Sequence, residues 1–333
     1  MKNVLLWLNC LIFADDKYSI MMVRTSKKKI TFWLIGALVL LLAGTVAWCM
    51  RAPKNTIPTA SRGSLERFSQ FKSQFIPSRD VVVWLPEGYQ TGDTCDVLYM
   101  HDGNMLFDAT TTWNRQEWQV DEIMDSLIQA GTIRPCIVVG VYNTDDRLTE
   151  YFPAKTWQHV AEADRKEANI NQLTADAYLQ FIVKELKPFI DERYKPLTNH
   201  EHTFMMGSSM GGLISLYALC EYPQVFGGVA CLSSHLSMGH LPEGVDGETW
   251  ATGFRDYVGQ HLPEVNSSLI YMDHGTKDFD ADYGPYQERL DSVITAKGWD
   301  RQHYLSLVFE GQGHNEKAWA KRLDQPLKFL LGR

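Results

Sequence analysis

The chain has 333 residues, of which 45% are hydrophobic, 22% are charged and 12% are aromatic. These fractions are close to the averages for folded globular proteins, which excludes intrinsic disorder, collagen and coiled coil as the main state of the chain. The formal net charge of −8 gives no electrostatic reason to expect a nucleic-acid partner.

An uncharged apolar stretch covers residues 30–50 and directly follows the lysines at 27–29. With a rise of about 1.5 Å per residue, a helix of this length would span roughly the 30 Å hydrocarbon core of a bilayer. The basic residues lie on its N-terminal side. This arrangement predicts that residues 1–29 are cytoplasmic and that everything after Met50 is exported, to the periplasm or the cell exterior.

The length of the stretch at 30–50 favours an uncleaved signal anchor, which would attach the protein to the membrane. A cleaved signal peptide is the second interpretation, and it would release a secreted protein after a cleavage site such as Thr45-Val46-Ala47. A buried helix of the folded domain is the third. Met21 and Met22, just before the basic cluster, are an alternative start of the chain.

Residues 51–63 are polar and contain proline and serine, which predicts a linker to one folded domain over residues 64–333. The first two predicted strands follow each other closely, which favours an antiparallel edge. Helices separate the later strands, which requires a mostly parallel central sheet flanked by helices, an α/β fold. Catalytic residues are then expected beyond the carboxyl ends of the strands. The predicted strands are residues 68–75, 81–85, 97–100, 137–141, 204–206, 229–232, 269–272 and 305–309, and the predicted helices are residues 119–130, 175–194, 210–222, 283–297 and 316–331.

The cysteines of this domain are Cys95, Cys136, Cys220 and Cys231, and they have no CxxC spacing. They are predicted to be small core residues, with one disulfide as the alternative in an exported domain. No spacing of histidines and cysteines indicates a zinc site, and no metal or other cofactor is expected.

The pentapeptide Gly-Ser-Ser-Met-Gly at residues 207–211 matches the pattern G-x-S-x-G. The pattern alone is weak, but an apolar strand precedes it and a helix follows it, which is the setting of a nucleophile elbow. Its glycines allow neighbouring backbone to approach, and the helix N-terminus directs its dipole at a developing oxyanion. Ser209 is therefore the predicted nucleophile, and a glycine-rich turn without chemistry is the alternative.

A serine nucleophile needs a base, which is expected on a loop after the last strand. His314 lies on such a loop, just before the final helix, and is the predicted base. An acid that orients the imidazole is expected after the penultimate strand, where Asp278 and Asp280 both qualify. The order serine, acid, histidine is that of α/β hydrolases. Asp278, Asp280 and a Ser–His dyad without an essential acid are the open alternatives.

The oxyanion hole is expected to combine the amide of Met210, directly after the nucleophile, with an amide from the loop after the strand at 97–100. That loop reads His101-Asp102-Gly103-Asn104, in which Gly103 allows close backbone approach. We predict that Gly103 supplies the second amide, with the amides of Asp102 and Asn104 as alternatives.

Candidate substrate contacts come from this loop and from the charged segment at 143–174, which follows a strand end and could cover the pocket. An internal ion pair that pins the segment is the alternative role for its charged residues. Trp113 and Trp118 could stack on a sugar or an aromatic acyl group, with core packing as their alternative role. The candidate contacts are His101, Asp102, Asn104, Arg147, Glu150 and Tyr151.

From about residue 65 to residue 333 the chain resembles the "putative esterase" family of α/β hydrolases, which includes enterochelin, feruloyl and acetylxylan esterases and S-formylglutathione hydrolase. The resemblance implies the α/β-hydrolase fold and a serine carboxylic-ester hydrolase with Ser209 and His314 in the roles given above. It implies less for the acid, since relatives vary at the positions of Asp278 and Asp280, and it does not imply a substrate. The matching stretches are RDVVVWLPEGY at 79–89, VLYMHDGNMLF at 97–107, RLTEYFP at 147–153, FMMGSSMGG at 204–212, DHGTKDFD at 273–280 and GHNEKAWAKR at 313–322.

The sequence therefore predicts a serine hydrolase that cleaves a small-molecule or carbohydrate ester through an acyl-enzyme. An acylated sugar and a siderophore-type ester are the substrates considered. An acyltransferase with the same triad is the first alternative. A catalytically inactive binding module on the hydrolase scaffold is the second, and the presence of both Ser209 and His314 counts against it. The oligomeric state stays open.

Overall fold

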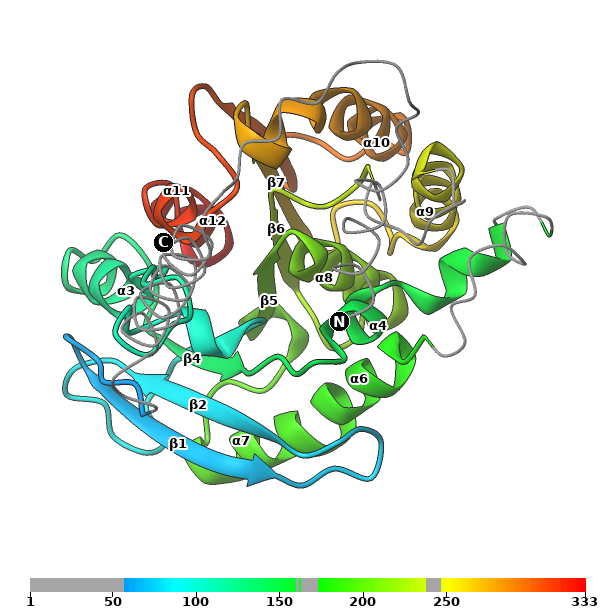
Figure 1. The fold of residues 1–333 in the computed structure, drawn as a ribbon. Coiled ribbons are helices and arrows are strands. Elements are labelled where there is room, and N and C mark those ends of the chain that lie inside the picture. Colours follow the sequence, from blue (N-terminus) through cyan, green and yellow to red (C-terminus); the bar gives the residue numbers. More distant parts are fainter. Residues whose placement is uncertain (1–56, 160–161, 163–172, 238–246) are drawn as a thin grey trace, which may run out of the picture. The chain divides into compact units, whose positions relative to one another are not determined.

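The computed structural model describes residues 57–159, 162, 173–237 and 247–333, all within the unit Pro53–Arg333 (Figure 1). The predicted segments 1–29 and 30–50 lie outside the described residues, as does most of the predicted linker. Within the described ranges, no helix is both long and apolar enough to cross a bilayer.

The described strands form an eight-stranded sheet in the order β1-β2-β4-β3-β5-β6-β7-β8. β1 with β2 and β2 with β4 are antiparallel pairs. The other pairs are parallel, so the predicted mostly parallel sheet with an antiparallel edge is confirmed. The strands are β1 (Ser64–Phe71), β2 (Arg79–Leu85), β3 (Asp96–Met100), β4 (Cys136–Val141), β5 (Thr203–Ser208), β6 (Gly228–Leu232), β7 (Leu269–Gly275) and β8 (Tyr304–Phe309).

Helices cover both faces of the sheet, with α3 and α12 on one face and α6 to α10 on the other (Figure 1). A π-helical turn at Ile182–Leu186 joins α6 to α7. The α-helices are α3 (Val120–Gln129), α4 (Arg147–Tyr151), α6 (Ala175–Phe181), α7 (Lys187–Tyr194), α8 (Met210–Glu221), α9 (Gly247–His261), α10 (Gly284–Ala296), α11 (Glu316–Ala320) and α12 (Asp324–Leu331). Short 3-10 helices lie at Gly103–Met105, Ala154–His159, His200–His202 and Asp278–Asp282.

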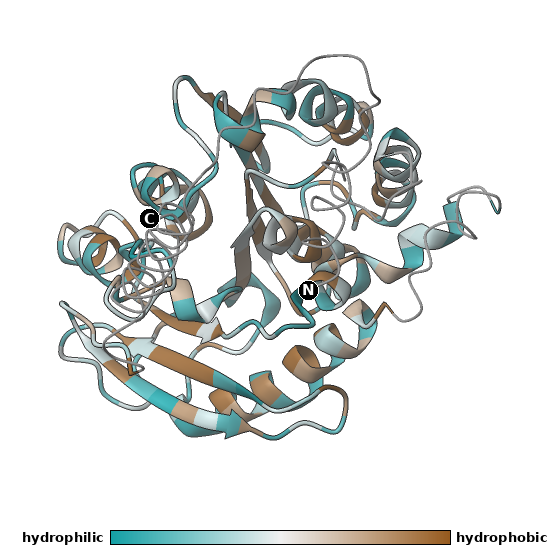
Figure 2. Cartoon of the chain, viewed as in Figure 1, coloured by the Kyte–Doolittle hydropathy of each residue, from teal (hydrophilic) through white to brown (hydrophobic). Residues whose placement is uncertain are grey.

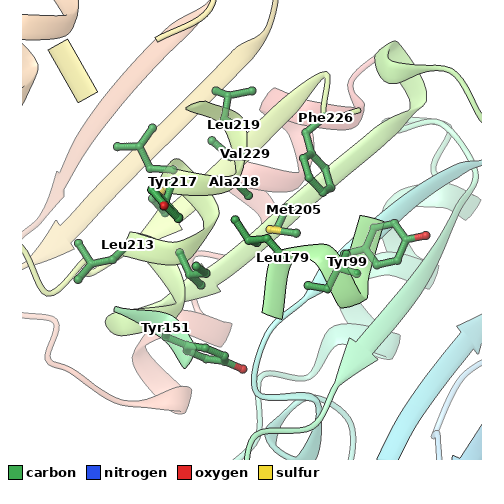
Figure 3. Packing of buried hydrophobic residues seen from close by; sticks show 14 of the residues in the cluster. Tyr99, Tyr151, Leu179, Met205, Leu213, Tyr217, Ala218, Leu219, Phe226 and Val229 are labelled. Atoms are coloured by element: carbon green, nitrogen blue, oxygen red, sulfur yellow. The ribbon is translucent and has the colours of Figure 1, made fainter. Parts of the chain in front are cut away.

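Successive side chains of the central strands point to opposite faces of the sheet, and both faces are buried. In β4, Ile137 and Val139 belong to the apolar cluster beneath α6 to α10, whereas Cys136 and Val138 belong to the cluster beneath α3 and α12. Figure 3 shows part of the first cluster, and Figure 2 shows that hydrophobic residues are concentrated on the central strands. Burial on both faces explains why these strands are continuous apolar runs rather than alternating ones.

The four domain cysteines, Cys95, Cys136, Cys220 and Cys231, are buried and unpaired. The prediction that they are small core residues is therefore confirmed. Burial raises the pKa of the Cys95 thiol to about 12, so this thiol stays protonated at neutral pH.

Several elements differ from the predicted ones, and three of them are described here. β1 runs over Ser64–Phe71 rather than over 68–75, and its pairing with β2 has a register shift between Phe68 and Phe71, where Gln70 has a left-handed φ of 51°. The helix predicted over 316–331 is divided into α11 and α12, since Pro326 near the start of α12 has no N–H to donate to the preceding turn. α9 was absent from the predicted elements, although its buried residues Trp250, Phe254 and Tyr257 recur at helical spacing.

The end of the predicted linker is part of the folded domain. The Ser61 N–H donates to the Asp121 carboxylate at the start of α3, at 2.6 Å, and the Arg62 carbonyl accepts from the Trp84 indole at 2.7 Å. These side chains supply hydrogen-bond partners for the backbone that precedes β1.

A buried ion pair connects the segment after β4 to the antiparallel edge of the sheet. Glu150 of α4 accepts two hydrogen bonds from the Arg79 guanidinium of β2, at 2.5 and 2.8 Å, and each side chain is 1% exposed. The guanidinium also lies over the ring of Tyr178, 5.4 Å from its centroid. Of the two roles considered for Glu150, the internal ion pair is the one that the structure shows.

Replacing Glu150 by alanine is expected to lower the free energy of unfolding by about 3–5 kcal/mol, because it leaves the Arg79 charge buried without a partner. The matched control is Glu248→Ala, which breaks an ion pair with Arg289 whose side chains are 45% and 49% exposed. That change is expected to cost about 0–1 kcal/mol. Urea denaturation of both variants measures the two losses in the free energy of unfolding. Equal losses would contradict the claim that burial of the Arg79–Glu150 pair makes its disruption costly.

Candidate active site

Ser209 occupies a sharp turn between β5 and α8, with backbone angles of φ 57° and ψ −122°. Few residues other than glycine adopt a positive φ, so the turn holds Ser209 under strain. The Ser209 N–H donates to the Leu232 carbonyl of β6 at 2.9 Å. The turn has no space for a side chain at Gly207, where a Cβ atom would lie 2.8 Å from the Gly211 backbone. Met210 is the first residue of α8, so the helix N-terminus directly follows the serine.

His314 lies on the loop between β8 and α11, and its Nδ1 is 2.6 Å from Oδ1 of Asp280. Three aromatic rings hold the imidazole nearly edge to face, with centroids between 5.1 and 5.7 Å away: Phe279, Tyr283 and Trp319. A proton on Nδ1 that is donated to a carboxylate leaves Nε2 as the basic nitrogen.

The Asp280 carboxylate is fully buried, and every oxygen atom in it has a hydrogen-bond donor. Oδ2 accepts from the Gly275 N–H at 2.6 Å and from the Ser233 hydroxyl at 2.5 Å. Burial alone would raise the pKa of Asp280, but the hydrogen bonds from His314, Ser233 and Gly275 together hold it below its usual value. The carboxylate is therefore charged at neutral pH.

Ser233 connects Asp280 to a buried cation. Its Oγ accepts from the Trp319 indole at 3.0 Å and from the Arg322 guanidinium at 2.7 Å, so its own proton goes to Asp280. Arg322 is 1% exposed and also pairs with Asp273. Ser233 and Arg322 were not among the predicted site residues, although Arg322 lies within the family-like stretch at 313–322.

The two predicted acids have different environments. Asp280 contacts the imidazole, whereas Asp278 is exposed and has a left-handed φ of 56°. The Asp278 carboxylate lies against the backbone of Gly313, where a Cβ atom would be 1.9 Å from its Oδ2. The structure thus brings Asp280, and not Asp278, to His314.

Tyr283, which precedes α10, contacts both His314 and His235. Its hydroxyl lies 2.6 Å from Nδ1 of His235. The residue is 2% exposed, and its ring meets the His314 ring at 90°. Tyr283 was also not predicted, because no sequence motif marks it.

The loop after β3 has the backbone geometry expected near an oxyanion hole. Gly103 is packed so closely on β4 that a Cβ atom would lie 2.5 Å from the Gly140 backbone. Asp102 has a left-handed φ of 54°, and its N–H donates to the Tyr151 hydroxyl at 3.3 Å. The oxyanion roles of Gly103 and Met210 stay predictions.

The predicted substrate contacts Asp102 and Arg147 form an ion pair. Nε and Nη2 of Arg147 each donate to an Asp102 oxygen at 2.7 Å, and Asn143 donates to the same carboxylate at 2.6 Å. Burial would raise the pKa of Asp102, but Arg147 lowers it below its usual value. The Arg147 side chain is 30% exposed, so it remains accessible beside the loop.

His101 and Tyr151 are buried, at 2% and 0% exposure. His101 Nδ1 lies 2.8 Å from the Tyr178 hydroxyl, and burial lowers the pKa of His101 to about 3, so its ring is neutral. Asn104 is half-buried, and its side-chain oxygen has no hydrogen-bond partner among the described residues. Substrate contact by these three residues stays a prediction.

Large apolar side chains are exposed on segments that follow the carboxyl ends of the strands. Trp113 is 75% exposed, Phe279 is 56% exposed and Leu148 is 53% exposed. Phe279 also contacts the His314 ring. Trp118, by contrast, is buried against Trp319, with ring centroids 5.2 Å apart, so it has the packing role. Within the described part of the chain, no group of three or more His, Cys, Asp or Glu residues is arranged to hold a metal ion.

Comparisons with known proteins show the family of the chain. Residues 75–330 match a family described as "Putative esterase". Among curated proteins, YbbA of Bacillus subtilis is 21% identical, over 77% of this chain and 94% of its own length. The siderophore enterobactin esterase of Emericella nidulans is 27% identical, over 44% of this chain and 48% of its own length. Among solved structures, a ferulic acid esterase superposes with a TM-score of 0.59 at 18% identity, over 81% of this chain and 98% of its own.

The family match covers most of the chain and includes the serine turn, the acid loop and the histidine loop. The structural likeness shows the same fold, in agreement with the strand order described above. The chain therefore belongs to the "Putative esterase" family and is a carboxylic ester hydrolase with an α/β-hydrolase fold.

Proposed function

We propose that the protein is a serine esterase whose catalytic triad is Ser209, His314 and Asp280. The observation that carries the proposal is the 2.6 Å contact between Asp280 and Nδ1 of His314. Their loops follow the parallel strands β7 and β8, at the same edge of the sheet as the strained turn after β5 that presents Ser209. A charged carboxylate there stabilises the imidazolium that forms when His314 takes a proton. The positions of their loops in the chain, which are those of α/β hydrolases, support the assignment of Ser209 as the nucleophile and of His314 as its base.

In the acylation step, Nε2 of His314 takes the Ser209 proton while Oγ attacks the ester carbonyl. The oxyanion that forms is bound by the amides of Met210 and Gly103. His314 then gives its proton to the departing alcohol, which leaves an acyl-enzyme. In the deacylation step, His314 takes a proton from water, and the resulting hydroxide attacks the acyl carbon. The bond between that carbon and Oγ of Ser209 then breaks, His314 returns its proton to Oγ, and the carboxylic acid leaves.

The proposed substrate is an ester with a planar or bulky group, such as an acylated sugar or a siderophore-type ester. Exposed Trp113 and Phe279 offer apolar surface on the loops around His314. Related proteins named as a ferulic acid esterase and an enterobactin esterase support this class of substrate. The Asp102–Arg147 pair offers a cation beside the loop that follows β3.

The test is hydrolysis of p-nitrophenyl acetate by the full chain, with methanol added as a competing acceptor. A serine esterase is expected to release a burst of p-nitrophenol equal to the enzyme concentration and then to form mainly acetate. Predominant formation of methyl acetate would favour the acyltransferase alternative. No p-nitrophenol above the buffer rate would favour the inactive binding module.

A further inference from the structure

Ser233, directly after β6, has its whole hydrogen-bonding capacity taken up by three neighbours. A serine hydroxyl has one proton to donate and two lone pairs that accept. The Trp319 indole and the Arg322 guanidinium can only donate, and they occupy the two lone pairs at 3.0 and 2.7 Å. The one Ser233 proton therefore goes to Oδ2 of Asp280, at 2.5 Å. The direction of this bond does not depend on the tautomer of any histidine.

Arg322 is itself held in one orientation by a second buried carboxylate. Its Nε and Nη2 donate to the two oxygens of Asp273 at 3.2 and 3.0 Å, and the Tyr271 hydroxyl donates to the same carboxylate at 2.9 Å. The side chains of Arg322, Asp273 and Asp280 are at most 1% exposed. Nη2 of Arg322 lies 3.8 Å from Oδ2 of Asp280, which is beyond hydrogen-bond distance. Ser233 is therefore the bridge between this guanidinium and the Asp280 carboxylate.

The two oxygens of Asp280 have separate partners. Oδ2 accepts from Ser233 and, at 2.6 Å, from the Gly275 N–H, whereas Oδ1 lies 2.6 Å from Nδ1 of His314. Rotation of the carboxylate would break both bonds to Oδ2, so these two donors keep Oδ1 facing the imidazole. A hydrogen bond donated to a carboxylate also stabilises its charged form and makes it a weaker base.

We propose that Ser233 is a positioning residue of the triad and that the Arg322 charge acts through it on Asp280. Together they hold Oδ1 toward His314 and draw negative charge from the carboxylate, so the Asp280–His314 pair stays free of an extra proton down to a lower pH. The proposal rests on the proposed role of His314, which can take the Ser209 proton only while its own Nε2 is unprotonated. Ser233 and Arg322 thereby set the lower pH limit of the reaction.

The test is the pH profile of kcat/KM for p-nitrophenyl acetate, measured on Ser233→Ala in the full chain. Activity falls on the acid side as the Asp280–His314 pair takes up a proton, and the two residues titrate together. Without the Ser233 donor the carboxylate is a stronger base, so the midpoint of this acid limb is expected to move up by about one pH unit. Because the midpoint does not depend on the amount of folded enzyme, a loss of stability alone does not move it.

The other titratable and charged groups near Asp280 are unchanged in Ser233→Ala, so the shift reports the lost hydrogen bond. Among the described residues they are Tyr271, Asp273 and His274 of β7, His235 after β6, Lys277, Asp278 and Asp282 in the acid loop, Tyr283 before α10, and His314 and Arg322 on either side of α11.

The matched control is Ser234→Ala, which removes the next hydroxyl along the chain. Ser234 is also buried, but its Oγ has no hydrogen-bond partner among the described residues. This variant is expected to keep the midpoint of the wild type. A midpoint that shifts as far in Ser234→Ala as in Ser233→Ala would overturn the proposal.

Ser233→Gly is a second variant that lacks the hydroxyl. Glycine suits the left-handed φ of 43° at this residue, so Ser233→Gly supplies a folded protein even where Ser233→Ala does not. The same upward shift is expected. A midpoint that is unchanged or lower without the hydroxyl, together with a lower melting temperature, would show a purely structural role and overturn the proposal.

Substitution of Arg322 tests the charge. Arg322→Met removes the buried cation, so the midpoint of the acid limb is expected to move up in this variant as well. Arg322→Lys keeps a positive charge and is expected to show a smaller shift. A wild-type midpoint in Arg322→Met would overturn the role of Arg322. A wild-type profile without an acid limb, or a p-nitrophenol burst that persists at its full rate in His314→Ala, would instead contradict the proposed base.

Discussion

Replacing Ser209 by alanine is expected to lower kcat for p-nitrophenyl acetate by about 10⁵- to 10⁶-fold and to abolish the p-nitrophenol burst. The Ser209 hydroxyl is the only group of the protein that forms a covalent bond to the substrate in the proposed reaction. The amides of the oxyanion hole would remain, so a small residual rate above the buffer rate is expected.

Ser208→Ala is the matched control for this change. Ser208 is the last residue of β5 and is buried, whereas Ser209 lies in the turn with a positive φ. The burst is expected to persist in this variant. A burst that persists in Ser209→Ala but disappears in Ser208→Ala would show that the wrong serine of the pentapeptide has been assigned.

Replacing Asp280 by asparagine is expected to lower kcat by about 10³- to 10⁴-fold, whereas Asp278→Asn is expected to change it by less than about threefold. An amide at residue 280 can donate to Nδ1 of His314, which stabilises the tautomer with the proton on Nε2 and removes the base. Asp278 is exposed and contacts the backbone of Gly313 instead. Steady-state kinetics on the two single variants measure the difference, and a larger loss in Asp278→Asn would contradict the assignment.

The stability contribution of Asp280 has a definite pH dependence. Its pKa is lower in the folded protein than in the unfolded chain, where an aspartate has a pKa of about 4. The contribution of Asp280 to the free energy of unfolding is therefore complete above the pKa of the unfolded chain. It is lost as the pH falls through the lower pKa of the folded protein. Asp280→Asn removes this contribution, so the variant is expected to lose less stability than wild type on acidification.

The sheet and the positions of Ser209 and His314 could be predicted because they depend on local patterns. Apolar runs identify strands that are buried on both faces, and G-x-S-x-G identifies a strand–turn–helix. The choice between Asp278 and Asp280 could not be made in this way. It depends on the 3-10 turn at Asp278–Asp282, which directs the second carboxylate inward and leaves the first exposed.

The groups that surround the triad depend on contacts between distant segments. Ser233 lies 47 residues from Asp280, and His235 lies 48 residues from Tyr283. No spacing rule connects such residues before the strands are ordered in the sheet. The division between α11 and α12 could have been predicted from the sequence, because Pro326 indicates an interruption of the helix.

Labelling of the full chain with a fluorophosphonate, followed by mass spectrometry of the modified peptide, tests the central claim most directly. The account predicts one labelled residue, Ser209, and labelling that falls sharply in His314→Ala. A folded wild-type protein that is not labelled, or that is labelled at another residue, would contradict the assignment of Ser209 as the nucleophile of this esterase.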